Sequence, residues 1–225
     1  MPTLFDPLKV GDLTLKNRIV MAPLTRARSG VERTPGPMVA QYYAQRASAG
    51  LIISEATSVT PLGVGYADTP GIWSEAQVEG WKLTTKAVHD AGGLIFMQLW
   101  HVGRISDPSL LDGQAPVSAS AIAVKGDVSL LRPKRPYPTP RALTLAEIAE
   151  VVEAYRQGAE NAKRAGFEHR ALESCLKGPP LEGKRRSNRK MALRSFGAKG
   201  KCCGKKKVRA LRKKDVSLKG KCGVN

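Results

Sequence analysis

The first 168 residues of this 225-residue chain contain no cysteine. All four cysteines follow that segment, at Cys175, Cys202, Cys203 and Cys222. None of them forms a Cys-x-x-Cys pair, which is the spacing that zinc sites commonly use. An extracellular disulfide framework would need cysteines throughout a short domain. The sequence therefore favours neither a zinc protein nor a disulfide-bonded secreted one.

Long apolar runs are also missing. No stretch is long enough to span a bilayer, and the N-terminus does not begin with the basic and apolar segments of a secretory signal. We therefore expect a protein of the cytoplasm that does not cross a membrane.

Acidic and aromatic residues become scarce in the last part of the chain. Residues 1–168 hold 18 Lys and Arg against 16 Asp and Glu, a net charge of +2, whereas residues 169–225 hold 19 against 3, a net charge of +16. The second segment has one aromatic residue, Phe196, so stacking on nucleic-acid bases is poorly supported. High charge with low hydrophobicity is typical of a disordered segment, and basic charge permits nonspecific binding of polyanions. We expect a near-neutral body, residues 1–168, and a basic tail, residues 169–225, which is either a passive solvated segment or a polyanion binder.

Short apolar runs alternate with amphipathic stretches in the body. Three runs predict buried strands, and helical periodicity follows each of them. The strands are expected at residues 18–26, 51–57 and 94–100, and the helices at residues 38–47, 74–93 and 144–166. A fourth strand is expected to begin at Phe167.

Local signals mark the ends and faces of these helices. Capping boxes are expected at the start of the second and third helices, from the pairs Ser74 with Gln77 and Thr144 with Glu147. Glycines are expected to end the three helices, at Gly50, Gly92 and Gly166. The apolar faces should consist of Val78, Trp81, Val88 and Ala91 in the second helix, and of Ile148, Val152, Tyr155, Ala159 and Ala162 in the third.

Strands that alternate with helices in this way predict a parallel sheet covered on both faces. Two architectures fit, an open doubly wound sheet and a closed (β/α)8 barrel. The first apolar run is not followed by the G-x-G-x-x-G pattern of a dinucleotide-binding fold, and "LGVGY" at residues 62–66 offers only G-x-G in a loop. We therefore predict an α/β protein of the (β/α)8 TIM-barrel class.

Enzymes with this barrel place their chemistry at the carboxyl ends of the strands. Thr25 follows the first strand, Ala56 lies near the end of the second, and Gln98 lies near the end of the third. Gln98 can donate and accept hydrogen bonds at once, which suits the edge of a planar heterocycle, although neighbouring backbone groups would satisfy it equally well. An unpaired buried amide would be costly, so one of these partners is required.

Two aromatic residues and two histidines are weaker candidates. Tyr66 and Trp100 have the shape to wall a flat pocket, but lone aromatic residues also serve in a core or at its rim. His101 offers an acid–base group, a ligand or a structural side chain. His89 has no partner that the sequence reveals, and we give it no role.

Several long motifs occur in order between about Thr3 and Glu168. They are "LFDPLKVGDLTLKNRIVMAPLTRARS", "YYAQRASAGLIISEAT", "GYADTPGIW", "QLWHVGRIS" and "QAPVSASAI". Together they resemble the Old Yellow Enzyme family of FMN-dependent ene-reductases, most of all its N-ethylmaleimide and xenobiotic reductase type. The resemblance implies a (β/α)8 barrel that binds FMN, takes its electrons from NAD(P)H and reduces a small activated alkene.

The resemblance also implies which residues hold the flavin. Pro23, Leu24 and Thr25 would lie along the flavin, with the Thr25 hydroxyl near the carbonyl at C4. Ala56 would pack against the isoalloxazine ring, and Gln98 would bond its pyrimidine edge.

On the substrate side the resemblance is incomplete. It implies that Tyr66 and Trp100 line the substrate, but the family's His-x-x-His/Asn-x-Tyr motif, which polarises the alkene and delivers the proton, is absent. When positions are counted from "AGF" at residues 165–167, the places of the motif's His, His/Asn and Tyr hold Glu173, Leu176 and Gly178. No catalytic residue is therefore assigned.

The chain thus looks like about the first half of such an enzyme, joined to an unrelated tail. Strands seven and eight, where such barrels usually hold a cofactor phosphate, are missing. We expect weak retention of FMN, impaired alkene reduction, and self-association through unpaired strand edges. The alternatives are a truncated or frame-altered product without function, and a polyanion binder that acts through its tail.

Overall fold

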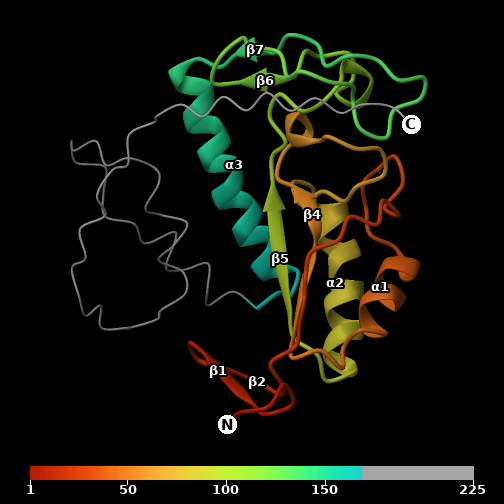
Figure 1. Ribbon diagram of the computed structural model, residues 1–225, viewed down its shortest axis with the longest axis vertical. Coiled ribbons are helices and arrows are strands. Elements are labelled where there is room, and N and C mark those ends of the chain that lie inside the picture. Colours follow the sequence, from red (N-terminus) through yellow and green to blue (C-terminus); the bar gives the residue numbers. More distant parts are fainter. Residues whose placement is uncertain (169–225) are drawn as a thin grey trace, which may run out of the picture. The chain divides into compact units, whose positions relative to one another are not determined.

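A computed structural model of the chain describes residues 1–168, and the fold below refers to these residues (Figure 1). The main sheet has three parallel strands, β3 (Val20–Met21), β4 (Leu51–Ser58) and β5 (Ile95–Trp100), in the order β3-β4-β5. They coincide with the three predicted strands, although β3 is much shorter than residues 18–26. Pro23 has no N–H group for the ladder, which agrees with the early end of β3.

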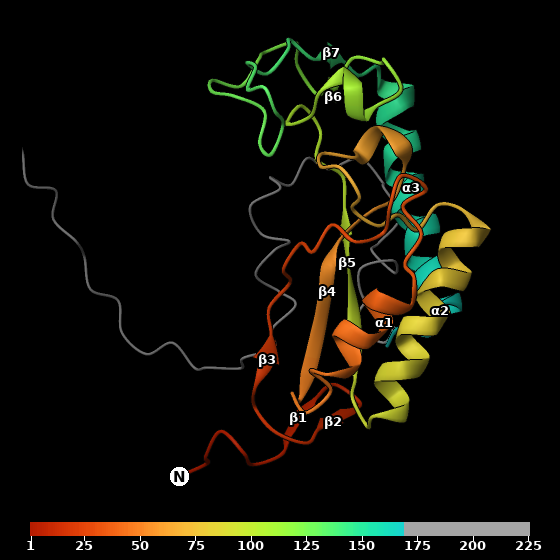
Figure 2. The same cartoon turned by 90° about the vertical axis from the view of Figure 1, so that its right-hand side faces the viewer.

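Three helices lie on one face of this sheet, as Figure 2 shows. They are α1 (Pro37–Ala44), α2 (Glu75–Asp90) and α3 (Leu145–Arg164). The core lies between helices and sheet, where the Trp81 ring meets Phe167 edge to face at 5.2 Å between centroids. Within residues 1–168 no helix covers the opposite face, so the expected cover on both faces is found on one only.

The register of the sheet positions the strand ends. Ile52 lies opposite Ile95, and after a bulge Ala56 lies opposite Gln98 and Ser58 opposite Trp100. Ile95 is fully buried under the helices. Because successive side chains of a strand point to opposite faces, Gln98 and Trp100 are directed away from the helices.

Both predicted capping boxes are present. The Ser74 hydroxyl accepts from the backbone N–H of Gln77, and the Thr144 hydroxyl accepts from that of Glu147, each at 3.3 Å. In both pairs the side chain at the third helical position bonds back to the backbone of the cap. The starts of α2 and α3 are therefore determined by local sequence.

Glycine follows two of the three helices as predicted. Gly92 and Gly166 adopt φ values of +69° and +89°, in the left-handed region that glycine tolerates best. The prediction for Gly50 was wrong, because α1 already ends at Ala44. Gly50 is instead required by close packing, since a Cβ there would collide with the carbonyl oxygen of Asn17.

The predicted apolar face of α2 is confirmed except at its end. Val78, Trp81 and Val88 are fully buried. Ala91 lies beyond the last helical residue and is exposed, so it does not belong to the buried face.

The apolar stripe of α3 is buried only in its second half. Ala159 and Ala162 are buried, whereas Ile148, Val152 and Tyr155 are 39%, 65% and 36% exposed. The helix is amphipathic over its whole length, but within residues 1–168 the apolar side of its first two turns stays largely exposed. This part of the prediction was wrong for the described residues.

The remaining elements are short. An antiparallel hairpin, β1 (Leu8–Val10) and β2 (Leu13–Leu15), precedes the sheet and was not predicted. Between β5 and α3 the chain forms a long loop region, which contains the two-stranded parallel pair β6 (Val117–Ser118) and β7 (Arg141–Ala142). Two 3-10 turns, Pro61–Gly63 and Pro108–Leu110, complete the elements. No helix in the described part is both long and apolar enough to cross a membrane.

The predicted fourth strand lies mostly outside the described residues. Glu168 lies beside the first residue of β5. Its N–H donates to the Ile95 carbonyl at 3.2 Å, and its carboxylate accepts from the Ile95 N–H at 2.7 Å. The chain is therefore aligned beside β5 at Glu168, and the rest of the prediction concerns residues that are not described.

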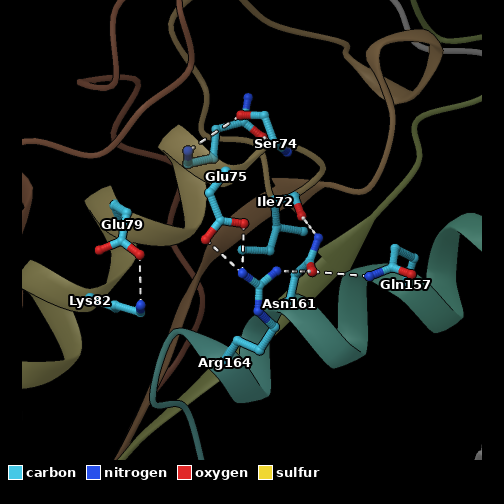
Figure 3. A network of polar contacts seen from close by, with 9 residues as sticks. Ile72, Ser74, Glu75, Glu79, Lys82, Gln157, Asn161 and Arg164 are labelled. Atoms are coloured by element: carbon cyan, nitrogen blue, oxygen red, sulfur yellow. Dashed lines mark hydrogen bonds and ion pairs between the residues drawn. The ribbon is translucent and has the colours of Figure 1, made fainter.

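Polar contacts join α3 to the start of α2 (Figure 3). The buried Asn161 amide donates to the Ile72 carbonyl at 2.8 Å, and its oxygen accepts from Gln157 and Arg164 at 3.1 and 3.2 Å. Arg164 also donates to both carboxylate oxygens of Glu75 at 2.6 Å. These contacts hold the last helix of the described part against the second.

Candidate functional site

The predicted site residues of β4 and β5 are brought together by the sheet. Ala56 and Gln98 are direct partners across the two strands, near their carboxyl ends. Ala56 is 8% exposed, and Gln98 is half-buried. The Gln98 backbone N–H donates to the Ser54 hydroxyl at 3.2 Å, but its side-chain amide makes no hydrogen bond within residues 1–168. Bonds to neighbouring backbone, the alternative considered for this amide, are not found there.

The residues after β3 lie at the same end of the sheet. Thr25 is half-buried, whereas Pro23 and Leu24 are exposed. β3 pairs with Leu51 and Ile52 at the start of β4. The chain then reaches the second half of β4, where Arg26 and Ala27, which follow Thr25, donate to the Glu55 carboxylate. Ala56 therefore lies opposite Gln98 on β5, and the residue before it, Glu55, is bonded to the residue after Thr25.

Tyr66 and Trp100 form the aromatic pair that the sequence suggested. Their ring centroids lie 5.5 Å apart, with the planes tilted by 36°. Trp100 ends β5, whereas Tyr66 comes from the loop before α2, where its carbonyl accepts from Arg33 at 3.1 Å. An aromatic wall therefore stands at the same end of β5 as Gln98.

Glu55 belongs to this site, although we proposed no role for it from the sequence. It is fully buried, and one carboxylate oxygen accepts from the backbone N–H groups of Arg26 and Ala27 at 2.8 and 3.1 Å. Tyr43 donates to the other oxygen at 3.4 Å. Burial raises the pKa of Glu55, and these donors oppose that rise. The signal in the sequence was an acidic residue inside an otherwise uncharged buried strand, "LIISEAT".

The two histidines of the described body have structural contacts. The His101 ring lies against Gly63 and accepts from the backbone N–H of Gly103 at 3.1 Å, and burial lowers its pKa. Its Nε2 is buried and unpaired within the described residues. His89, which we left without a partner, lies 3.0 Å from the Glu168 carboxylate. These contacts favour the structural alternative for His101.

Ala56 and Gln98, for which the resemblance implies contact with a flavin, lie outside two cavities of the described part. One cavity of about 550 Å³ lies near Arg33 and the start of α2, and another of about 550 Å³ lies between β3 and α1. Neither is lined by Ala56 or Gln98. Residues 1–168 contain no group of three His, Cys, Asp or Glu side chains that could hold a metal ion.

Comparison with known proteins identifies the family. Residues 3–169 match the profile of the NADH:flavin oxidoreductase / NADH oxidase family, named Oxidored_FMN. The chain belongs to this family. The resemblance inferred from the sequence motifs is thereby confirmed, and FMN and NAD(P)H are the cofactors that go with this family of oxidoreductases.

Relatives with known names are nearly half identical to this chain over the segment that aligns. Chanoclavine-I aldehyde reductase fgaOx3 of Penicillium roqueforti is 46% identical over 173 residues, which cover 75% of this chain and 44% of the relative. 12-Oxophytodienoate reductase 7 of Oryza sativa subsp. japonica is 44% identical over 170 residues, which cover 73% of this chain and 43% of the relative. The chain therefore spans about half the length of the curated relatives it matches.

Solved structures confirm the fold class. The Old Yellow Enzyme homologue of Zymomonas mobilis has a TM-score of 0.70 and 52% identity, over 74% of this chain and 46% of that one. Morphinone reductase in complex with tetrahydroNAD has a TM-score of 0.69 and 52% identity, over 74% of this chain and 48% of that one. The described residues are thus part of a TIM barrel, which explains a sheet with helices on one face only.

Proposed function

We propose that residues 1–168 carry one side of an FMN site at the carboxyl ends of β3, β4 and β5. Pro23, Leu24 and Thr25 would lie along the flavin, Ala56 against its ring, and Gln98 at its pyrimidine edge. Tyr66 and Trp100 would line the substrate side. We extend the same proposal to the domain boundary, with a partial barrel in residues 1–168 and a separate basic tail in residues 169–225.

The pairing of Ala56 with Gln98 carries this proposal. A flat ring needs a small side chain beneath it and polar groups at its edge, and β4 and β5 place one of each directly opposite each other. The Gln98 amide has both a donor and an acceptor, and neither is used within the described residues. The Thr25 hydroxyl, at the end of the neighbouring strand, adds a second polar group at the same end of the sheet.

FMN, when bound, supplies the hydride chemistry between NAD(P)H and an activated alkene. The described residues would bind and orient it: Gln98 through its amide, Thr25 through its hydroxyl, and Ala56 by permitting close approach. Tyr66 and Trp100 would exclude water from one side of the substrate. None of these side chains stands at the place of the family's proton-donating tyrosine, which Gly178 occupies in this sequence.

We further propose that alkene reduction is severely impaired in this chain. Glu173, Leu176 and Gly178, outside the described residues, occupy the places of the family's polarising and proton-donating residues. Leucine cannot bond a carbonyl, glycine has no side-chain proton, and an ionised glutamate would repel the developing enolate. General acid catalysis and oxyanion stabilisation each contribute on the order of 10²-fold or more in comparable sites.

Anaerobic turnover of 2-cyclohexenone with NADPH and added FMN tests both parts of the proposal. We expect an FMN-dependent absorbance change on titration that Gln98→Ala weakens and the exposed control Gln114→Ala does not. We expect turnover close to that of free flavin. A rate well above the free-flavin control that is lost in Gln98→Ala would show that a complete active site exists and that the predicted impairment is wrong.

A second candidate function rests on the charge of the tail. Residues 169–225 carry 19 basic and 3 acidic residues, so their net charge of +16 favours contact with polyanions through release of counterions. Salt-dependent retention on heparin that disappears when residues 169–225 are deleted would support this function. Retention that is unchanged by the deletion would refute it.

The chain's origin bears on all of these proposals. We propose a cytoplasmic protein that self-associates, and we retain the alternative of a truncated or frame-altered product. The genomic DNA after codon 168 distinguishes them: a second reading frame that encodes His-x-x-His/Asn-x-Tyr would make the tail a product of altered frame.

A further inference from the structure

Glu55 connects two strand ends of the proposed flavin site. Its carboxylate leaves β4 and accepts from two successive backbone N–H groups, those of Arg26 and Ala27, in the segment that follows β3. Arg26 comes directly after Thr25, and Glu55 comes directly before Ala56. The buried Glu55 side chain therefore links the neighbour of Thr25 to the neighbour of Ala56.

The local backbone is shaped to receive this carboxylate. Ala27 adopts a φ of +51°, in the left-handed region that costs a residue with a Cβ about 1 kcal/mol or more. That conformation directs its N–H and the preceding one toward the same point, as in backbone anion-binding sites. A buried carboxylate without donors would be strongly unfavourable, so the turn and Glu55 stabilise each other.

Two further contacts support the arrangement from either side. The Tyr43 hydroxyl accepts from the Glu55 backbone N–H at 2.7 Å and donates to its carboxylate at 3.4 Å, so it bonds both the backbone and the side chain of Glu55. The Arg26 guanidinium lies 5.2 Å from the centre of the Tyr42 ring, which also meets the Arg46 guanidinium at 3.7 Å and the Tyr43 ring at 5.0 Å. The segment after Thr25 is thus held at its backbone by Glu55 and at its side chain by Tyr42.

We propose that Glu55 is a positioning residue of the flavin site, which sets the place of Thr25 relative to Ala56 by bonding the turn at Arg26 and Ala27. It touches neither the flavin nor the substrate. The proposal rests on the proposed FMN site, and the length of the side chain, not its charge alone, is what the geometry requires.

Three variants of the full chain separate positioning from general stability. Glu55→Gln keeps the length and an oxygen that accepts from both N–H groups, but loses the charge. Glu55→Asp keeps the charge but is shorter, so it cannot reach the turn. Asn161→Ala, at a buried polar contact between α3 and the segment before α2, serves as a control that destabilises the body elsewhere.

The first measurement needs no flavin. Amide hydrogen exchange in residues 24–28 and tryptic cleavage after Arg26 and Arg28 report on the order of the turn. We expect both to rise by about tenfold or more in Glu55→Asp, because loss of bonds to two buried donors costs more than the 1.4 kcal/mol that corresponds to tenfold. Glu55→Gln should stay within about threefold of the wild type, and Asn161→Ala should leave this segment unchanged.

The second measurement is a titration with FMN, in which the position and intensity of the flavin absorbance band are monitored. We expect the dissociation constant to rise about tenfold in Glu55→Asp and to be largely restored in Glu55→Gln. An ordered turn in Glu55→Asp, or equal loosening in Asn161→Ala, would overturn the inference. A wild-type chain with no band change at any FMN concentration would refute the proposed function, and the exchange result would still decide whether Glu55 positions the turn.

Discussion

Asn161 offers the sharpest test of how the described helices are held together. Its side chain is 4% exposed and makes three hydrogen bonds, of which the one to the buried Ile72 carbonyl spans from α3 to the segment before α2 (Figure 3). Asn161→Ala leaves that carbonyl without this donor, which costs about 1–3 kcal/mol. Alanine regains roughly 0.5 kcal/mol of helix propensity. We therefore expect a net loss of about 2 kcal/mol in the free energy of unfolding.

Two neighbouring substitutions calibrate this value. Gln157→Ala removes an exposed amide one turn earlier, and its effect should stay within about 0.5 kcal/mol. Arg164→Ala breaks the ion pair with Glu75, but these side chains are 50% and 62% exposed, so the loss should be about 1 kcal/mol or less. The buried amide is therefore expected to matter more than the charged pair.

Thermal unfolding followed by circular dichroism, at one protein concentration, measures all three variants. A loss of about 2 kcal/mol corresponds to roughly 4–8 °C in the apparent midpoint for a domain of this size. An Asn161→Ala midpoint within about 1 °C of the wild type, or a larger shift in Arg164→Ala than in Asn161→Ala, would show that the buried hydrogen bond does not dominate this contact.

Three further predictions concern the whole chain. Purified protein should be colourless or lose FMN on desalting, because the described flavin face is open; a stoichiometric yellow complex that survives gel filtration would contradict this. The chain should self-associate in sedimentation analysis, since β3 has an unpaired edge within the described residues and Ile148 and Val152 of α3 are exposed; a monodisperse monomer would argue against it. Hydrogen bonds from Arg141 and from the backbone and hydroxyl of Thr144 lower the pKa of Glu147 from 4.5 to about 2. The ionised carboxylate therefore stabilises the start of α3 fully above pH 4.5, and this stabilisation is lost as the pH falls toward about 2. The Thr144 amide signal in NMR should titrate near pH 2, and Glu147→Gln should abolish that titration; a midpoint near 4.5 would mean that the contact to Arg141 is weak in solution.

Local sequence was sufficient for the elements and their helical caps. β4 and β5 appear where apolar runs predicted them, because a buried parallel strand needs apolar residues on both faces. The capping boxes at Ser74 and Thr144 form within four residues of chain, so nothing distant is needed to specify them. The family motifs likewise pointed to Thr25, Ala56 and Gln98, since each lies in an unbroken segment of sequence.

Tertiary structure decided what depends on residues far apart in the chain. The amphipathic pattern of α3 predicted a buried face, but burial requires a partner, and within residues 1–168 Ile148 and Val152 remain 39% and 65% exposed. Gly50 was taken for a helix end, although it is required by close contact with Asn17. The sequence marked Glu55 as an acidic residue in a buried strand but could not show its partners, because Arg26 and Ala27 lie 29 and 28 residues away. A hydrogen bond across that distance depends on β3 and β4 lying side by side, and periodicity within one segment carries no information about which strands become neighbours.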